Sequence, residues 1–268
     1  MEFYSFLEKI LTTFKIDEKE IFLKKAFEAL KKGELSKEHV PKSFPLPSYA
    51  FVCKIVDPKE LPLRKEFHTK EGLAKLLHAI AHIEFSAIDL AVDAVYRYPF
   101  MPREYKYDWL VVAEDEIRHF RMIEEILREL GYKYGDFPVH TGLMDAAQRS
   151  KDDILERMAI IPRYYEAGGL DANPQIMKKL SSYKKNPSVK KSIEALSVIY
   201  EEEISHVRKG DKWFKYLCKE RGVKEDIYFE ILDKYSLLNK HRAHINKEAR
   251  KIAGFSCEEI IKLGSKEC

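Results

Sequence analysis

Two copies of a Glu-x-x-His pattern are the part of this sequence best suited to chemistry. Glu116 and His119 form the first copy, and Glu203 and His206 form the second. On a helix, residues three apart lie on adjacent turns of one face, with Cβ atoms roughly 5–6 Å apart. A carboxylate and an imidazole at that spacing can both reach one metal ion, so each copy predicts half of a metal site.

An isolated glutamate in a mostly apolar helical stretch precedes each copy. Glu84 lies in AIAHIEFSAIDLAV, and Glu166 lies in IIPRYYEAGGL. Four carboxylates and two imidazoles in this order are the ligand set of a dinuclear metal site inside a four-helix bundle. The predicted metal ligands are Glu84, Glu116, His119, Glu166, Glu203 and His206.

The apolar surroundings of Glu84 favour a buried site and also indicate the metal. Steps of three and four residues along its helix meet only leucine, isoleucine and alanine, from Leu73 to Ala91. An ionised carboxylate on such a face is costly unless it is paired or bound to a metal. Oxygen-rich ligation with one imidazole per ion favours iron or manganese, whereas zinc sites usually carry more histidine or cysteine. We therefore expect two iron ions, with manganese or a mixed iron and manganese pair as the alternative.

Glycine and proline positions predict where the four long helices that carry these ligands begin and end. Thr69 is a candidate N-cap for the first, Gly131 stops the second, and Pro162 lies inside the third. The loop after Gly131 is long enough for the crossover connection of ferritin-like folds. The expected helices cover residues 69–98, 103–130, 142 or 150 to 167, and 187–221.

Helix heights distinguish the two isolated glutamates. Glu84 lies 14 residues before the end of its helix and Glu116 lies 13 residues after the start of the next, so a hairpin sets them level. Glu166 lies one turn before Gly168 and Gly169, which are expected to end or break the third helix. It reaches the height of the second Glu-x-x-His copy only if the chain continues as a kinked helix. Glu156 is the alternative ligand, at a less favourable separation.

The flanking segments complete the all-α fold that is expected around the ferritin-like four-helix bundle. Two short helices and a proline-rich wrapping segment precede the bundle, and short helices follow it. The sequence AFVCKIV, residues 50–56, is the one stretch where a short strand is expected. The predicted domains are residues 1–68 for the N-terminal arm, 69–221 for the bundle and 222–268 for the C-terminal extension.

Composition limits the classes of partner and compartment. Charged residues make up 34% of the 268-residue chain and the formal net charge is +3, a balance that favours neither a nucleic-acid nor a membrane partner. No signal-peptide pattern opens the sequence, and no stretch approaches the roughly 18 apolar residues of a membrane span. The scattered cysteines suggest neither a disulfide framework nor a thiolate zinc site, and they suit a reducing, cytoplasmic setting. They are Cys53, Cys218, Cys257 and Cys268.

Several other polar residues near the predicted ligands have two interpretations. His78 and His82 are one turn apart, yet lie more than about 90° around the helix from Glu84, so we expect them to pack against neighbouring segments. Tyr165 and Tyr200 are candidates for a redox relay, although such tyrosines are more often half-buried packing residues. Two arginines could neutralise the site or bind an anionic substrate; they are Arg118 and Arg163.

Five stretches make this sequence similar to the ferritin-like superfamily and, more narrowly, to an uncharacterised bacterial family, domain of unknown function 455. They are LLHAIAHIEFSAIDLAVDAVYR, DWLVVAEDEIRHF, GDFPVHTGLMDAAQRS, MAIIPRYYEAGGLD and EEEISHVRKGDKWF, within roughly residues 60–255. The resemblance implies a four-helix core with the six ligands named above. One departure is Gly168, where the family pattern has arginine, so no anion-binding arginine is implied at this position.

Two kinds of function are compatible with such a site. The first is an oxidase or oxygenase that activates dioxygen and acts on an unknown small-molecule substrate. The second is an iron-binding or ferroxidase protein, or a helical module stapled by its metal, without an organic substrate. The N-terminal arm and the proline-rich segment argue against a storage cage, so a monomer or homodimer is expected. The sequence itself names no substrate.

Overall fold

A computed structural model describes residues 2–33, 35, 39–238 and 244–268 of the chain, and every regular element within them is helical. The predicted all-α class is therefore confirmed. The chain divides into two compact units, which are described separately below: residues 1–144 with 183–195, and residues 145–182 with 196–268. None of the described helices is both long and apolar enough to cross a membrane.

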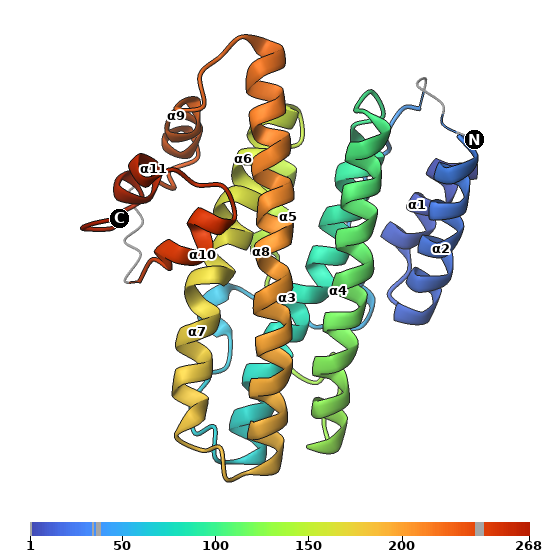
Figure 1. Cartoon of the computed structure of the whole chain (residues 1–268). Coiled ribbons are helices and arrows are strands. Elements are labelled where there is room, and N and C mark those ends of the chain that lie inside the picture. The colour runs from blue at the N-terminus through green and yellow to red at the C-terminus, as the bar shows by residue number, and fades with distance from the viewer. Residues whose placement is uncertain (1, 34, 36–38, 239–243) are drawn as a thin grey trace. The chain divides into compact units, whose positions relative to one another are not determined.

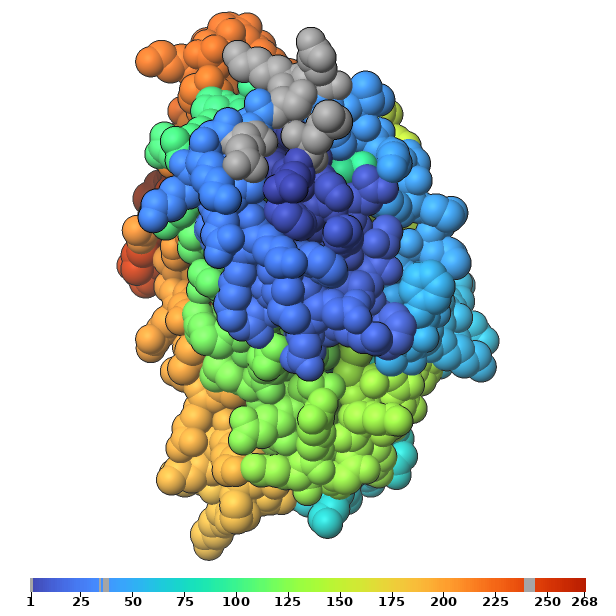
Figure 2. All heavy atoms as spheres, turned by 90° about the vertical axis from the view of Figure 1, so that its right-hand side faces the viewer, coloured from blue at the N-terminus to red at the C-terminus, as the bar shows by residue number. Residues whose placement is uncertain are grey.

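The first unit is built on a helical hairpin that carries a second, N-terminal hairpin. α3 and α4 pack along each other, while α1 contacts α3 and α2 contacts α4. Figure 1 shows the long pair in cyan to green, and Figure 2 shows the N-terminal residues in blue spread over one face. The helices are α1 (Glu2–Thr12), α2 (Ile16–Lys32), α3 (Lys70–Arg97) and α4 (Arg103–Glu129).

The beginning of α3 follows the sequence prediction closely. Thr69 adopts an extended backbone and its hydroxyl accepts a hydrogen bond from the Gly72 amide at 3.0 Å, as an N-cap does. The predicted apolar face is buried, with Leu73, Leu77 and Ile88 entirely shielded from solvent. Packing of α3 against α4 and α1 fixes the height and direction of α3.

The strand expected at residues 50–56 does not form within the described residues, so this prediction is wrong. A 3₁₀ turn, η1 (Ser48–Phe51), replaces its first half, and η2 (Pro58–Glu60) follows it. Between them, Ile55 makes one isolated bridge to Val139, with only two backbone hydrogen bonds. The nearby prolines have no amide hydrogen, so a longer ladder of backbone hydrogen bonds cannot develop.

The second unit is also helical, and its longest helix begins within the residues of the first. α5 likewise starts in the residues of the first unit, and α8 contributes residues 196–221 here. The elements are α5 (Gly142–Arg149), α6 (Ile154–Ile160), η3 (Ile161–Glu166), α7 (Ala167–Ser181), α8 (Pro187–Arg221), α9 (Ile227–Lys234), α10 (Lys247–Ile252) and α11 (Cys257–Lys262).

The third predicted helix does not end at its glycine pair. The chain runs from α6 through η3, a π-helical turn, directly into α7, which contains Gly168 and Gly169 and continues to Ser181. Pro162 lies at the start of η3, and a wider turn accommodates a residue that cannot donate a helical hydrogen bond. The continued, irregular helix that Glu166 requires is therefore the one that forms.

Two cysteines in the C-terminal segment correct the expectation that no disulfide is present. Cys257 and Cys268 form a disulfide across 11 residues, with their Cα atoms 5.4 Å apart. Cys53 and Cys218 are free and buried. Sequence spacing alone does not fix such a pair, because a turn after α11 must bring the two residues within bonding distance.

Candidate metal centre

Three predicted ligands meet in the first unit. Glu84 comes from α3, while Glu116 and His119 come from α4, and their ligand atoms all lie within 4.8 Å of one another. His119 Nδ1 is 3.2 Å from Glu116 Oε2 and 3.4 Å from Glu84 Oε2. All three side chains are buried. We refer to these three residues as the first half-site.

Burial shifts the acid–base properties of the first half-site. Removal from water, reinforced by the negative charge of Glu116, raises the pKa of Glu84 to about 8. Burial alone would disfavour a charged imidazole, but hydrogen bonds to Glu116 and Glu84 outweigh it and raise the pKa of His119 to about 11. Both shifts favour the protonated forms of Glu84 and His119 when no metal is bound.

The second Glu-x-x-His copy has the same local geometry in the second unit. His206 Nδ1 lies 3.2 Å from Glu203 Oε2, the same distance as between His119 and Glu116. His206 is fully buried, whereas 13% of the Glu203 side chain is exposed. The regular turn of α8 produces this pair just as the regular turn of α4 produces the first, because both have the same spacing of three residues.

Glu166 ends the π-helical turn and is half-buried. The next turn of the chain lies against α8, since a Cβ placed on Gly169 would be 3.8 Å from Glu203 Oε1. We refer to Glu166, Glu203 and His206 as the second half-site. By contrast, the carboxylate of Glu156 is held by Lys234 and by the Tyr235 hydroxyl, each at 2.5 Å. Neither Glu166 nor Glu156 is among the described groups whose ligand atoms lie within 4.8 Å of one another, so the choice between them stays a prediction.

His78 and His82 pack as predicted and do not join the first half-site. His82 Nδ1 is 2.9 Å from the Tyr134 hydroxyl, and its Nε2 is 2.9 Å from the His140 carbonyl oxygen. His78 Nε2 accepts a hydrogen bond from the Gly135 amide at 2.9 Å. Both rings therefore connect α3 to the loop after α4.

The two arginines considered in the sequence form ion pairs with carboxylates other than the six predicted ligands. Arg118 pairs with Asp115 on the same helix at 2.8 Å. Arg163 is fully buried and pairs with Asp211 at 2.9 Å and Glu259 at 2.7 Å. No sequence signal indicates Glu259, which lies 96 residues further along the chain.

The two tyrosines proposed as a redox relay occupy different surroundings. The Tyr200 hydroxyl accepts a hydrogen bond from Asn246 Nδ2 at 2.7 Å. Tyr165 makes an edge contact with the ring of Tyr164, with 5.2 Å between ring centroids. Both tyrosines have ordinary packing or hydrogen-bonding roles, and a relay stays a prediction.

Comparison with known proteins identifies relatives for most of the chain. Residues 12–261 match the family described as Protein of unknown function (DUF455). The chain is also 42% identical over 214 residues to an "Uncharacterized protein" of Haemophilus influenzae, a match that covers 77% of this chain and 72% of the relative. No solved structure matches. The match begins well before residue 60, so it takes in much of the N-terminal arm that the sequence resemblance left out.

Proposed function

This protein belongs to the DUF455 family, and we propose that it is a ferritin-like, dinuclear metal protein that uses iron to activate dioxygen. The proposed ligands are the six residues of the two half-sites. The observation that carries the proposal is the buried cluster of Glu84, Glu116 and His119, whose ligand atoms lie within 4.8 Å of one another. The same carboxylate–imidazole pair recurs in α8 at the same 3.2 Å separation.

The donor atoms of the half-sites fit iron better than zinc. Each half-site offers two carboxylates and one imidazole, and no cysteine is among the six proposed ligands. Carboxylate oxygens with imidazole suit iron and manganese, and structural zinc sites usually contain more sulfur or nitrogen. We propose iron first and manganese as the alternative.

The charge of the first half-site also supports a bound cation. Two carboxylates and one imidazole leave an excess of negative charge in a place closed to water, which is costly without a compensating cation. In the metal-free protein, protons fulfil that role, as the raised pKa values of Glu84 and His119 indicate. A divalent ion would displace these protons, so we expect metal binding to release protons.

When bound, two ferrous ions would supply the electrons for reduction of dioxygen. The contribution of the protein is then to hold the ligands in place and to exclude water. Full burial of His119 and His206 serves the second purpose. We propose that the product is an oxidised small molecule.

The proposal is tested by adding excess Fe(II) to anaerobically purified protein, then dioxygen, while recording bound iron and the optical spectrum. We expect two irons per chain and one round of oxidation that resumes only when an electron donor is added. Continuous oxidation of added Fe(II) would instead indicate iron handling. Iron at background levels, or equal iron binding in the Glu116→Gln variant, would overturn the proposal. Glu114→Gln is the matched control, because Glu114 is exposed on the same helix.

A further inference from the structure

Arg163 is a fully buried cation placed three residues before a proposed metal ligand. It lies on η3, the π-helical turn that ends at Glu166. Its Nη2 atom is 2.9 Å from Asp211 Oδ1 on α8 and 2.7 Å from Glu259 Oε1 on α11. A charge without solvent needs partners, so the position of η3 is coupled to both of these carboxylates.

Aromatic rings enclose the same guanidinium group. Its central carbon lies 4.5 Å from the ring centroid of Phe214, 4.4 Å from that of Tyr228 and 4.6 Å from that of Phe255. Rings at these distances attract a cation and keep water away from it. The Tyr228 hydroxyl also donates a hydrogen bond to the Arg163 carbonyl oxygen at 3.0 Å. Both the side chain and the backbone of this turn are therefore held.

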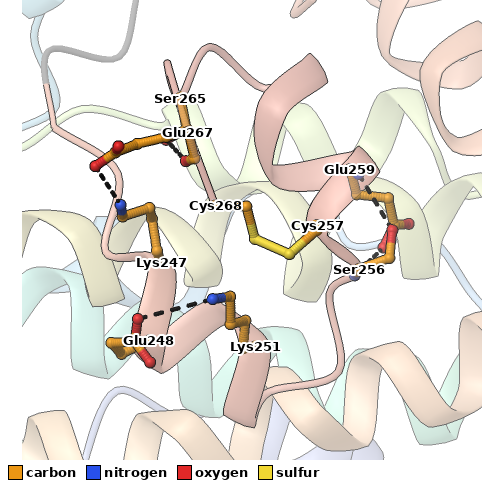
Figure 3. The surroundings of a disulfide bond; sticks show 9 residues. All are labelled: Lys247, Glu248, Lys251, Ser256, Cys257, Glu259, Ser265, Glu267 and Cys268. Carbon is orange, nitrogen blue, oxygen red and sulfur yellow. Dashed lines mark hydrogen bonds and ion pairs between the residues drawn. A yellow bond between two sulfur atoms is a disulfide. The ribbon is translucent and has the colours of Figure 1, made fainter.

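Glu259 is in turn fixed by the local structure of α11. Its carboxylate accepts a hydrogen bond from the Ser256 amide at 2.8 Å, and its own amide donates to the Ser256 hydroxyl at 3.2 Å. Figure 3 shows this capping pair beside the disulfide. The same carboxylate thus caps α11 with one oxygen and pairs with Arg163 through the other.

α11 has only six residues, so it needs support from outside itself. The disulfide joins Cys257, its first residue, to Cys268 at the end of the chain. An ion pair between Lys247 and Glu267, at 3.0 Å, also connects the last residues of the sequence to α10. Opening the disulfide would remove the covalent link between α11 and the last residues and leave α11 held by its capping pair, its ion pair with Arg163 and packing.

We propose that Arg163 is a positioning residue for Glu166. The Cys257–Cys268 disulfide supports this role because it holds Glu259, the partner of Arg163, in place. This inference rests on the proposed function, because it takes Glu166 to be a metal ligand. Every contact in the series lies within the second unit. The predicted consequence is a second half-site that is ordered when the disulfide is closed and loosened when it is open.

The disulfide can be opened chemically as well as by substitution. A dithiol such as dithiothreitol gives two electrons to the S–S bond, the bond breaks, and each sulfur takes a proton. The reductant closes to its own cyclic disulfide. Cys53 and Cys218 are already free thiols, so this treatment changes only the Cys257–Cys268 pair.

The first measurement is hydrogen exchange across residues 161–169 in the metal-free, full-length protein. We expect the exchange rate there to rise at least about 10-fold on reduction, in the Cys257→Ser/Cys268→Ser variant and in Glu259→Gln. The matched control is Glu258→Gln, an exposed neighbour on α11 that should leave the rate unchanged. Unchanged exchange in both the cysteine variant and Glu259→Gln would overturn the inference.

The second measurement uses Co(II), whose visible absorption reports its coordination. Opening the disulfide should weaken Co(II) binding by about 10–100-fold, as loss of support for a ligand does, and should change the band shape. Arg163→Lys, which keeps a cation, should bind more tightly than Arg163→Ala. If the wild type binds no Co(II), the proposed function fails, while hydrogen exchange still decides the coupling. Co(II) binding and band shape that do not respond to the disulfide would overturn the positioning role.

Discussion

The two half-sites contain the same pair of side chains but differ in the helix that presents the isolated glutamate. In both, the histidine Nδ1 lies 3.2 Å from the glutamate Oε2. Glu84 is buried in the middle of a regular 28-residue helix, whereas Glu166 is half-buried at the end of a π-helical turn. The comparison teaches that helical spacing alone sets the Glu-x-x-His pair, while tertiary packing sets the isolated glutamate.

A buried cation accompanies the isolated glutamate in each unit. In the first, Lys19 of α2 is fully buried and its Nζ lies 2.5 Å from Asp89, five residues after Glu84. In the second, Arg163 lies three residues before Glu166 and pairs with Glu259 of α11. The chain's terminal segments, which lie outside the predicted bundle, therefore stabilise the helices that present the isolated glutamates.

The largest expected effect comes from breaking the buried pair of the first unit. Lys19→Met should lower the free energy of unfolding by about 3–5 kcal/mol, because it leaves Asp89 as an uncompensated buried charge. Urea denaturation measures this. Lys24→Met is the control, since Lys24 pairs with Glu20 at the surface, and it should leave the midpoint unchanged. A Lys19→Met variant as stable as this control would contradict the proposed role of the pair.

A second prediction concerns the pH dependence of the stability of the first unit. Burial lowers the pKa of His78 to about 4, below the value of about 6.5 for a free histidine. Between these values the unfolded chain binds the extra proton, so stability should fall as the pH drops from about 6.5 to 4, by about 3 kcal/mol. His78→Gln should remove this part of the pH dependence. Equal slopes of unfolding free energy against pH in the wild type and in His78→Gln would contradict the claim that a neutral His78 stabilises the fold.

A third prediction tests how closely η3 packs in the second unit. A Cβ on Gly210 would lie 2.2 Å from the Pro162 Cβ, so Gly210→Ala must push η3 away from α8. Overpacking of this kind costs about 1–3 kcal/mol, which thermal unfolding can detect. Gly169→Ala is the matched control, because its new Cβ would make only an ordinary 3.8 Å contact with Glu203. Equal stability of the two variants would contradict the close packing.

Much of the fold follows from the sequence because its signals are local. The N-cap at Thr69, the stop at Gly131 and the fourth helix over residues 187–221 all appear as expected. The apolar face around Glu84 is buried for the same reason, since a 3.6-residue period fixes which residues share a face.

What the sequence misses depends on contacts between distant segments. Gly168 and Gly169 read as a helix end, yet packing keeps them helical. The partners of Lys19 and Arg163 lie 70 and 96 residues away, and no local pattern links residues so far apart. The sequence does not reveal the disulfide, because the pairing of scattered cysteines depends on the turn that follows α11.

The most direct test of the central claim is the number of metal ions that each half-site variant binds. Anaerobic equilibrium dialysis with Mn(II) should give two ions per chain for the wild type and fewer for both Glu84→Gln and Glu203→Gln. Glu114→Gln and Glu201→Gln, which alter exposed glutamates on the same two helices, should still bind two. A wild type that binds no Mn(II), or Glu84→Gln and Glu203→Gln variants that bind as much as these controls, would contradict a dinuclear site built from the two half-sites.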